Sequence, residues 1–399
     1  VLGRTCCIAQ DSHDTSRSTV DTSRVDRTLA PIFLSSTSRF EIEIQTVMEG
    51  FWEHVETTLK LARLPMTVFS AVTYGTATSM VRLDPSTTTD FDVWFFIAGY
   101  VFMFSCQMVA HFLGEYYDLE SDRLNVHSSK FTGGSKVLLS GKVSPMRALV
   151  YGYVSLAVAV GVLFLHLPVR VLPIGVGMLF IAHQYSAQPF SLNHNGFGEI
   201  GATIVMNVLV PHFAALLQSN KFSPWIPLDS TLFILVIPAA LQKFSLFLVL
   251  NLADQRPDWL ANKRTIPVIF GEEFACELVS LCTWASYVMM MGMYMMGFCD
   301  EILLVFMLVF FPDGFHIIKQ FSKKGPKDFN VLALQYLKLA PSTLVAAFMS
   351  CLLHEVVVDP LREGNWNLGV AVPTMCAKLF SLSLIIRVLP VLPFVLRFL

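Results

Sequence analysis

Three acidic side chains follow the second long apolar run of the chain at a spacing that brings them together. Glu115, Asp118 and Asp122 stand at i, i+3 and i+7. On a helix with about 100° of rotation per residue, their side chains fall within an arc of roughly 60°. Acids gathered in this way at the end of a membrane span repel each other and are costly to desolvate unless a positive charge lies among them. The pattern therefore predicts a site that binds a cation.

The same arrangement recurs later in the chain. Asn251, Asp254 and Asp258 repeat the spacing directly after another apolar run. One such stripe would equally fit an ordinary helix end with solvated acids, but two with matched spacing predict one site built from two halves. A diphosphate bridged to the carboxylates by Mg²⁺ suits that site, because Mg²⁺ takes oxygen ligands and shares its shell between carboxylates and substrate phosphates. We expect Mg²⁺ as the cofactor, all six side chains as its candidate ligands, and the four aspartates, which include Asp118 and Asp122, as catalytic acids.

Basic residues follow both acidic stripes. Lys130 and Lys136 come after the first, and Lys263 and Arg264 come after the second. Ammonium and guanidinium groups supply the point charge and the planar fork that phosphate oxygens bind, so we expect these four residues to contact the diphosphate. The glycines of residues 132–136 could bring backbone N–H groups to the same phosphates. A flexible linker and cytosolic anchoring beside the membrane are the alternative interpretations of these segments.

Composition places the chain among polytopic α-helical membrane proteins. Of its 399 residues, 54% are hydrophobic and only 15% are charged, and the mean hydropathy is +0.58. A soluble domain carries roughly 25% charged residues. No basic patch interleaved with aromatic residues stands out, so we expect a lipid bilayer and no nucleic acid as partner. The sequence leaves the oligomeric state open.

Ten apolar runs approach the length of about 20 residues that a helix needs to cross a bilayer. The last contains Pro373, Pro390, Pro393 and Arg387, which would suit a kinked, re-entrant or interfacial segment. The predicted fold is an all-α polytopic bundle of nine transmembrane helices, plus a possible extra C-terminal apolar helix. The predicted spans are residues 65–81, 92–114, 146–166, 168–187, 198–218, 230–250, 274–297, 300–319 and 333–353, with residues 371–398 as the tenth run.

The two ends of the chain differ in composition from this region. Residues 1–45 are a polar mixture without sustained periodicity, which predicts mostly disorder. An amphipathic stretch over residues 51–64 suits the membrane interface. We therefore expect three parts: a disordered segment over residues 1–45, the transmembrane domain over residues 46–353, and an extension with an apolar helix over residues 354–399.

Loop charge predicts the orientation of the bundle. Most basic loop residues follow the second, sixth and eighth spans, and basic residues favour the cytosolic side. Both acidic stripes follow even-numbered spans, so we expect both to open on the cytosolic side of an integral multi-pass membrane protein. The sequence does not identify the organelle, for which the endoplasmic reticulum and the mitochondrial inner membrane are the candidates in a eukaryote.

These motifs resemble the UbiA superfamily of intramembrane prenyltransferases, and most of all its menaquinone-pathway (MenA-like) branch. The likeness extends over residues 61–353. Gly114-Glu115-Tyr-Tyr-Asp118-Leu-Glu-Ser-Asp122 resembles the family's N-D-x-x-D-x-x-x-D, and Thr-Gly-Gly-Ser-Lys resembles its G-G-[ST]-[RK] element. Residues 185–199 resemble a Y-[ST]-x-P-P…G-x-G-E segment, and residues 251–271 resemble the second acidic motif with its K-[RN]-T-[LI]-P-V-x-x-G tail. The resemblance implies a bundle around a central cavity, Mg²⁺, an isoprenyl diphosphate donor and a substrate-contacting Tyr185.

The chain departs from the family pattern at a few positions. Gly114 stands where the family usually has Asn, and Glu115 replaces Asp. Gln188 replaces the first proline of the pair, and the basic residue expected soon afterwards is absent from the sequence Ser-Leu-Asn-His-Asn-Gly. The later departures fall where the acceptor should bind, so they leave the identity of the acceptor open.

The function predicted from these residues is Mg²⁺-dependent transfer of an isoprenyl group from its diphosphate to an aromatic or quinoid acceptor. One alternative is a UbiA-type terpene cyclase, in which a C15–C20 prenyl diphosphate ionises and folds on itself. The other is an ion-coupled transporter built on repeated spans. Its weakness is that the acids stand at the ends of spans, whereas coupling residues lie near the midplane.

Overall fold

The computed structural model describes residues 36–83, 91–126, 132–219, 231–299, 301–323 and 327–364. Within these ranges the chain forms helices joined by turns and loops, with one isolated bridge between Asn195 and Arg264. The chain divides into two compact units, residues 1–55 and 56–399, and the larger one is described below. Lys130 and the apolar run over residues 371–398 lie outside the described residues, so the predictions made for them stay predictions.

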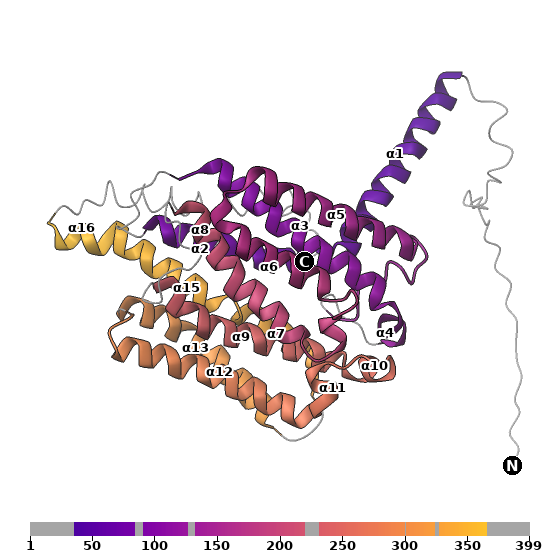
Figure 1. Cartoon of the computed structure of the whole chain (residues 1–399). Helices are drawn as coiled ribbons and strands as arrows, with labels where there is room; N and C mark the ends of the chain where they lie inside the picture. Colours follow the sequence, from indigo (N-terminus) through magenta and orange to yellow (C-terminus); the bar gives the residue numbers. More distant parts are fainter. Residues whose placement is uncertain are drawn as a thin grey trace, which may run out of the picture. The chain divides into compact units, whose positions relative to one another are not determined.

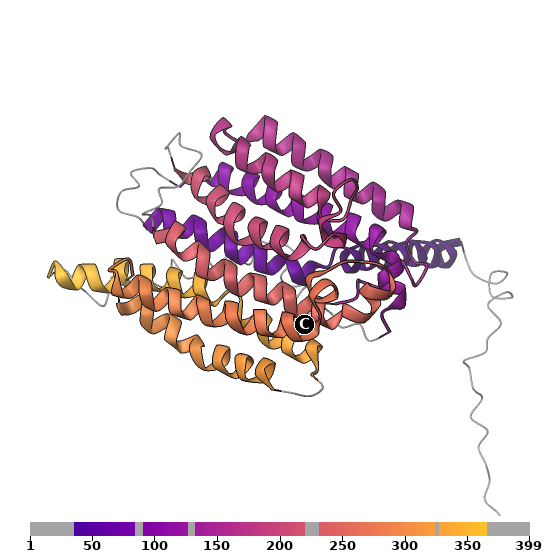
Figure 2. The same cartoon turned by 60° about the horizontal axis from the view of Figure 1, so that its bottom comes forward.

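The larger unit is built from long apolar helices (Figures 1 and 2). Neighbouring helices in contact include α3 with α5, and α9 with α12. The principal elements are α2 (Leu64–Leu83), α3 (Val93–Tyr117), α5 (Pro145–His166), α6 (Leu172–Gln184), α7 (Gly198–Thr203), the π-helix η5 (Ile204–Leu209), α8 (Val210–Gln218), α9 (Thr231–Ala253), α12 (Glu272–Met295), α13 (Glu301–Ser322), α14 (Phe329–Leu339) and α15 (Ser342–Leu353).

Six helical segments of the described chain are long and apolar enough to cross a membrane: Val93–Tyr117, Pro145–His166, Gly198–Gln218, Val236–Ala253, Glu272–Met295 and Glu301–Ser322. The other three predicted spans also coincide with helices. The first is α2, the fourth is the shorter apolar segment Val169–Gln184, and the ninth is divided into α14 and α15. The all-α membrane fold is therefore confirmed, and the number of nine crossings stays a prediction.

The predicted N-terminal disorder does not extend as far as residue 45. Helix α1 runs over Ser36–Leu61, so residues 36–45 are helical. Helix α1 contains no proline and a single glycine, Gly50. The sequence of this helix therefore has few residues that disfavour helix formation. Residues 1–35 lie outside the described residues. At the other end, the described part of the expected extension forms the π-helix η6 (His354–Val358) and α16 (Asp359–Arg362).

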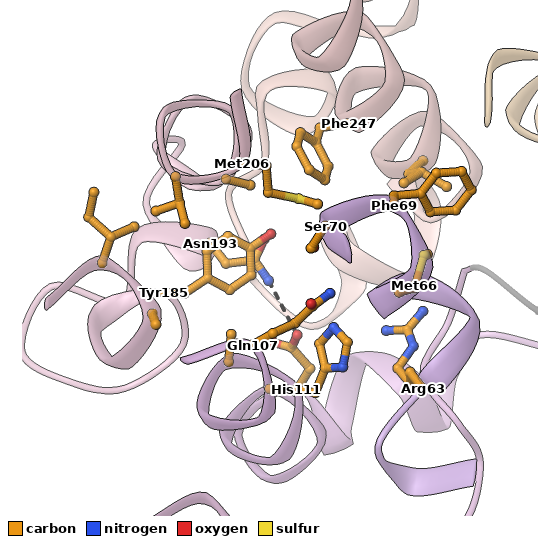
Figure 3. Close-up of a pocket in the computed structure, with 18 of the residues that line it drawn as sticks. Arg63, Met66, Phe69, Ser70, Gln107, His111, Tyr185, Asn193, Met206 and Phe247 are labelled. Atoms are coloured by element: carbon orange, nitrogen blue, oxygen red, sulfur yellow. Dashed lines mark hydrogen bonds between the residues drawn. The ribbon is translucent and has the colours of Figure 1, made fainter. Parts of the chain in front are cut away.

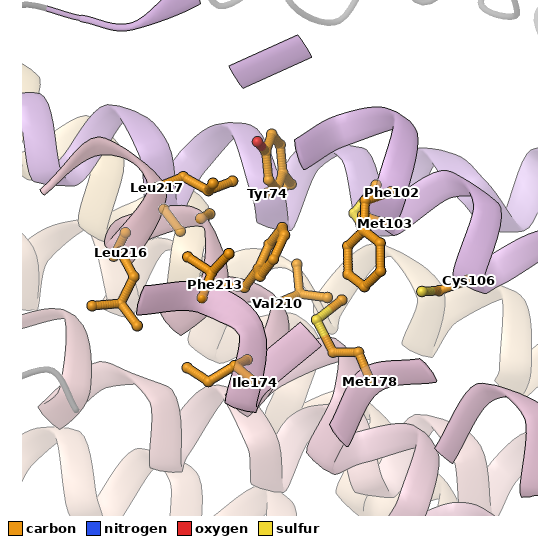
Figure 4. Close-up of a cluster of buried hydrophobic side chains, with 14 of the residues drawn as sticks. Tyr74, Phe102, Met103, Cys106, Ile174, Met178, Val210, Phe213, Leu216 and Leu217 are labelled. Atoms are coloured by element: carbon orange, nitrogen blue, oxygen red, sulfur yellow. The ribbon is translucent and has the colours of Figure 1, made fainter. Parts of the chain in front are cut away.

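Groups of buried apolar side chains hold the bundle together, and two of them are the largest. The first joins α2, α3, α6 and α8 and includes Tyr74, Phe102, Met178 and Phe213 (Figure 4). The hydroxyl of Tyr74 is satisfied, since it donates to the Phe96 carbonyl at 2.9 Å. The second group joins α9, α12, α13 and α14. By contrast, large apolar side chains stand exposed along α5 and other outer helices, as expected for helices that face lipid.

Short helices connect the long ones at one end of the bundle. They are α4 (Leu119–Leu124), which follows α3, and α10 (Gln255–Leu260) and α11 (Ile266–Phe270), which follow α9. Figure 1 shows all three at the same end, and α4 contacts α10 directly. Both acidic stripes lie where a long helix ends and its short successor begins, so this end of the bundle positions the candidate site.

Candidate active site

The two acidic motifs have the same local architecture. Asp118 lies between α3 and α4 and is the N-cap of α4, and Asp254 holds the same place between α9 and α10. Neither carboxylate makes a hydrogen bond that caps its short helix; both interact instead with groups from other segments. The equal spacing in the sequence thus reflects the same helix–turn–helix geometry used twice.

Hydrogen bonds run directly from the first motif to the second. The Asn125 amide donates to Asp254 Oδ1 at 2.7 Å, and the Ser121 hydroxyl donates to Asp258 Oδ1. The Lys263 ammonium lies 3.5 Å from Asp118 Oδ2 and 3.5 Å from Asp258 Oδ1. The two motifs, more than a hundred residues apart in the sequence, therefore form one cluster.

The glycine-containing loop after α4 closes over both motifs. Glu115 accepts hydrogen bonds from the Ser135 backbone N–H at 2.7 Å and from its hydroxyl at 2.6 Å. The Gly133 N–H donates to Asp254 Oδ2 at 2.9 Å. At Gly134, with φ +70°, a Cβ would lie 1.9 Å from Asp122 Oδ2. A side chain at that position would be strained and would displace the Asp122 carboxylate, so glycine lets the loop approach the acids.

The electrostatics of the cluster show excess negative charge. Burial raises the pKa of Asp122 to about 7, with the Asp118 and Glu115 carboxylates adding to the effect. Burial likewise raises the pKa of Asp254 to about 6, with a contribution from Asp258. At Asp118, burial would raise the pKa, but Lys263 and His194 outweigh it and the net pKa lies below the ordinary value. The cluster would therefore favour additional positive charge.

A partly open cavity of about 250 Å³ lies among these residues. Acidic side chains lie along one part of its wall, and the rest is largely apolar. Figure 3 shows Phe247 and Met206 on one side of the space and Gln107 and His111 on the opposite side. The predicted site residues that line the cavity are Glu115, Asp118, Asp122, Tyr185, Asn251, Asp254 and Lys263.

Other predicted site residues lie elsewhere. The Lys136 ammonium donates to the backbone carbonyls of Asp122 and Asn125, at the end of α4, and does not line the cavity. Arg264 is exposed and lines a separate polar groove with His194. Asp258 is 1% exposed, and its Oδ2 has no hydrogen-bond partner among the described residues. It lies behind the cavity wall.

Three residues near the acids were not predicted from the sequence. His194 Nε2 lies 2.6 Å from Asp118 Oδ1, and the Asn193 amide donates to Asp118 Oδ2 at 3.2 Å. His194 occupies the segment that was expected to lack a basic residue. Arg63, between α1 and α2 with φ 50°, also lines the cavity. It lies within the amphipathic segment over residues 51–64 that leads into the first span, but no local pattern marks it as a site residue.

Asn251 is held by a residue of another helix. Its amide donates to Glu199 Oε1 at 2.8 Å, and the same oxygen accepts the Ile266 N–H at 2.9 Å. Glu199 opens α7, so it connects that helix to the end of α9 and to α11. This arrangement fixes the orientation of the Asn251 side chain.

The carboxylate oxygens at the cavity suit Mg²⁺ that is bound together with a phosphate group. Among the described residues, no three carboxylate, histidine or cysteine side chains converge as a metal cluster. Mg²⁺ is commonly bound by one or two carboxylates together with substrate phosphates, and four carboxylates line this cavity. The residues therefore fit an ion that arrives with a phosphorylated ligand.

Sequence comparisons identify a family and a named relative. The model of the UbiA prenyltransferase family matches residues 78–339. The 1,4-dihydroxy-2-naphthoate octaprenyltransferase of Bacillus subtilis is 24% identical over 210 residues, which cover 52% of this chain. The matched part spans 65% of that relative, slightly less than two thirds of its length.

Solved structures share the fold at low sequence identity. A digeranylgeranylglyceryl phosphate synthase matches with a TM-score of 0.53 and 15% identity, covering 75% of this chain and 99% of its own. A UbiA homologue from Archaeoglobus fulgidus, solved with DMAPP and Mg²⁺, matches with a TM-score of 0.51 and 16% identity, covering 73% and 99%. At these identities the likeness concerns the fold.

Proposed function

The chain belongs to the UbiA prenyltransferase family, and from that premise we propose that it transfers an isoprenyl group from its diphosphate to an aromatic or quinoid acceptor with the help of Mg²⁺. Membership confirms the resemblance noted from the motifs, and with the apolar spans it makes the chain an intramembrane prenyltransferase. The cofactor, the acceptor class and the site residues are parts of the proposal.

One observation carries the proposal: acids from both motifs line a single cavity whose remaining wall is largely apolar. A prenyl diphosphate has the same two-part chemistry, with a multiply charged head and a hydrocarbon tail. The A. fulgidus homologue of the same fold was solved with DMAPP and Mg²⁺, and the B. subtilis relative is named for a naphthoate acceptor. Both agree with a prenyl donor and an aromatic acceptor.

We assign the head of the donor to the acidic part of the cavity. Glu115, Asp118, Asp122 and Asp254 would hold Mg²⁺ together with the phosphate oxygens. The ion, when bound, would offset the negative charge that develops on the leaving diphosphate. Lys263 directly faces this region, and its charge favours the same departing oxygens.

Arg63 is the second cation of this proposed clamp. Its guanidinium lines the cavity and can present two parallel N–H groups to a phosphate. In this proposal Arg63 has the phosphate-binding role that was expected for Arg264 from the sequence. We place Lys136 in a supporting role, because it ties the end of α4 to the loop that carries Ser135.

The apolar wall would protect the transfer step. As the allylic C1–O bond breaks, its electron pair stays on the diphosphate, and an acceptor atom bonds to C1 while the acceptor's displaced proton leaves with the diphosphate. Water competes for the same carbon, and side chains such as Met103, Met178 and Leu250 line the cavity and exclude it. Tyr185 and Phe247 add aromatic faces, which favour a nearby cation.

The proposed membrane arrangement follows from the same cluster. Because both motifs meet in one cavity, both open on one side of the bilayer. Loop charge favours the cytosolic side for that face. Labelling single cysteines near Ser121 from either side of sealed vesicles would measure the orientation.

Purified protein in lipid nanodiscs tests the proposed activity. We expect it to release pyrophosphate from a C15 or C20 prenyl diphosphate only when Mg²⁺ and an aromatic acceptor are both present, and to yield a prenylated acceptor. A hydrocarbon product without acceptor would replace the transferase with a cyclase. Absence of pyrophosphate release with every chain length and acceptor would contradict the proposal.

A further inference from the structure

Lys243 is a buried cation that the proposed diphosphate clamp does not use. It lies in α9, is 2% exposed, and lines the cavity. Its ammonium lies 5.4 Å from the centroid of the Phe69 ring. Within the described chain, it has neither an ion pair nor a hydrogen bond. A side chain of this kind is costly to bury unless an anion joins it.

The diphosphate is not the partner that Lys243 lacks. Lys243 precedes Asn251 by eight residues on the same helix, which is about 12 Å along the axis at 1.5 Å per residue. Asp254 lies further on, beyond the end of α9. A diphosphate bound among the acids would therefore be too distant to pair with this ammonium. Between the two positions, the cavity offers space for the group that reacts at C1.

Gln107 provides a second unsatisfied polar group on the same cavity. It comes from α3, and its Oε1 is buried without a hydrogen-bond partner among the described residues. Figure 3 shows Gln107 directed toward the central space. The cavity therefore presents a cationic donor on α9 and a neutral acceptor on α3. A ligand with an anionic oxygen and a separate hydroxyl group would satisfy both.

We propose that Lys243 binds an anionic oxygen of the prenyl acceptor, a carboxylate or a phenolate, and thereby makes ionisation of the prenyl diphosphate depend on the acceptor. In this arrangement Gln107 accepts a hydrogen bond from an acceptor hydroxyl. The inference rests on the proposed function and specifies its second substrate.

Ionisation of the prenyl diphosphate depends on the acceptor because of the positive charge of Lys243. An unpaired ammonium on the cavity wall repels the allylic carbocation in a medium of low dielectric constant. When the acceptor's anion pairs with Lys243, this repulsion is largely cancelled and the C1–O bond can break. A carbocation that cyclised on itself would have no such compensation. The position of Lys243 therefore favours a transferase over a cyclase.

Lys243→Met tests this role, with Lys243→Arg as the charge-conserving variant. Lys338→Met is the matched control, because Lys338 is exposed on α14. Three acceptors serve as probes: a dihydroxynaphthoate, its methyl ester and the unsubstituted dihydroxynaphthalene. Equilibrium binding of each acceptor is measured in nanodiscs without diphosphate, and pyrophosphate release is then measured with and without acceptor.

We expect Lys243→Met to weaken binding of the acidic acceptor by at least about 10-fold, as for the loss of a charge-assisted hydrogen bond, while Lys243→Arg retains most of it. Equal losses for all three acceptors would identify a phenolate, and a loss confined to the acid would identify a carboxylate. Acceptor-independent pyrophosphate release should rise in Lys243→Met. The thermal midpoint of this variant should not fall, because methionine removes an unpaired buried charge.

Unchanged binding of all three acceptors together with unchanged acceptor-independent release would overturn this inference while leaving the transferase intact. Failure of the wild-type protein to release pyrophosphate with any acceptor would instead overturn the proposed function. Because acceptor binding is measured without turnover, the two failures are distinguishable.

Discussion

The two halves of the acidic cluster have the same spacing in the sequence but differ in the structure. In the first half, Glu115, Asp118 and Asp122 all line the cavity. In the second half, Asn251 and Asp254 line it, whereas Asp258 lies behind the wall against Ser121 and Lys263. The third acid thus faces the ligand space in one half and supports a lysine in the other. Equal spacing predicts a shared helix geometry and does not guarantee an equal role.

The basic residues differ between the halves in the same way. Lys136 of the first half turns its ammonium to backbone carbonyls at the end of α4. Lys263 of the second half lies between Asp118 and Asp258. The second half therefore supplies positive charge to the first, and the site is complete only when both are present. The predictions below compare equivalent residues across the two halves.

Loss of the central aspartate should have the largest effect, and it should be similar in both halves. Asp118→Ala and Asp254→Ala each remove a carboxylate from the cavity, and we expect each to lower kcat by about 100- to 1,000-fold. Glu120→Ala is the control, because Glu120 is exposed and pairs with Arg123 on the surface at 3.8 Å. Pyrophosphate release in nanodiscs gives the rates. A near-normal rate in either aspartate variant would remove that half from the site.

The two lysines should respond differently to the same substitution. Lys263→Met leaves Asp118 and Asp258 without their buried cation, which costs about 3 kcal/mol or more in folding stability and should lower kcat by about 100-fold. Lys136→Met removes hydrogen bonds to carbonyls only, so we expect a smaller loss. Thermal midpoints and rates measured on both variants make the comparison. Equal losses would contradict the assignment of Lys263 as the central cation.

Substitution of the third acid of each motif, Asp122 or Asp258, should distinguish a residue that binds the metal from one that supports the site. Asp122→Asn removes a charge that lines the cavity, so we expect the Mg²⁺ concentration for half-maximal activity to rise by at least about 10-fold. Asp258→Asn leaves the cavity wall unchanged and should affect stability more than the Mg²⁺ requirement. Magnesium titrations of both variants test the difference. If Asp258→Asn shifts the requirement as strongly as Asp122→Asn, the two halves are equivalent after all.

The smallest expected effect concerns the loop that covers the first half. Gly134→Ala would place a Cβ against Asp122 at a backbone φ of +70°, so we expect activity to fall by about 10-fold and stability by about 1–3 kcal/mol. Gly141→Ala is the matched control, since Gly141 has φ +74° but nothing within 4 Å of its Cβ position. Comparing the two separates the cost of the backbone conformation from that of the clash. Equal behaviour would mean that loop proximity to Asp122 is unimportant.

The fold and the meeting of the two motifs could be predicted because they depend on local patterns. Apolar runs of sufficient length placed the long helices, and the repeated spacing indicated that Asp118 and Asp254 share a site. The helical start of α1 was missed because a polar composition was taken as disorder. The division of residues 333–353 into α14 and α15 was also missed, although Pro341 marks the boundary between them.

The basic residues could not be predicted with the same success, because their positions depend on tertiary structure. Arg63, His194 and Lys243 belong to no recognisable pattern in the sequence and reach the site through the arrangement of separate helices. Lys136 and Arg264 follow the motifs closely in sequence, yet their side chains lie outside the cavity. Of the two neighbouring basic residues, Lys263 therefore lines the cavity and Arg264 does not, and the phosphate contacts predicted for both stay predictions.

The most direct test is a double-mutant cycle on binding of a non-hydrolysable prenyl thiolodiphosphate in the presence of Mg²⁺. Asp118→Asn and Asp254→Asn are measured singly and together in nanodiscs. If the two halves bind one diphosphate, each single variant weakens binding by at least about 10-fold, and the double variant loses less than the product of the two. Binding at wild-type strength in either single variant, or fully independent losses, would contradict a shared site.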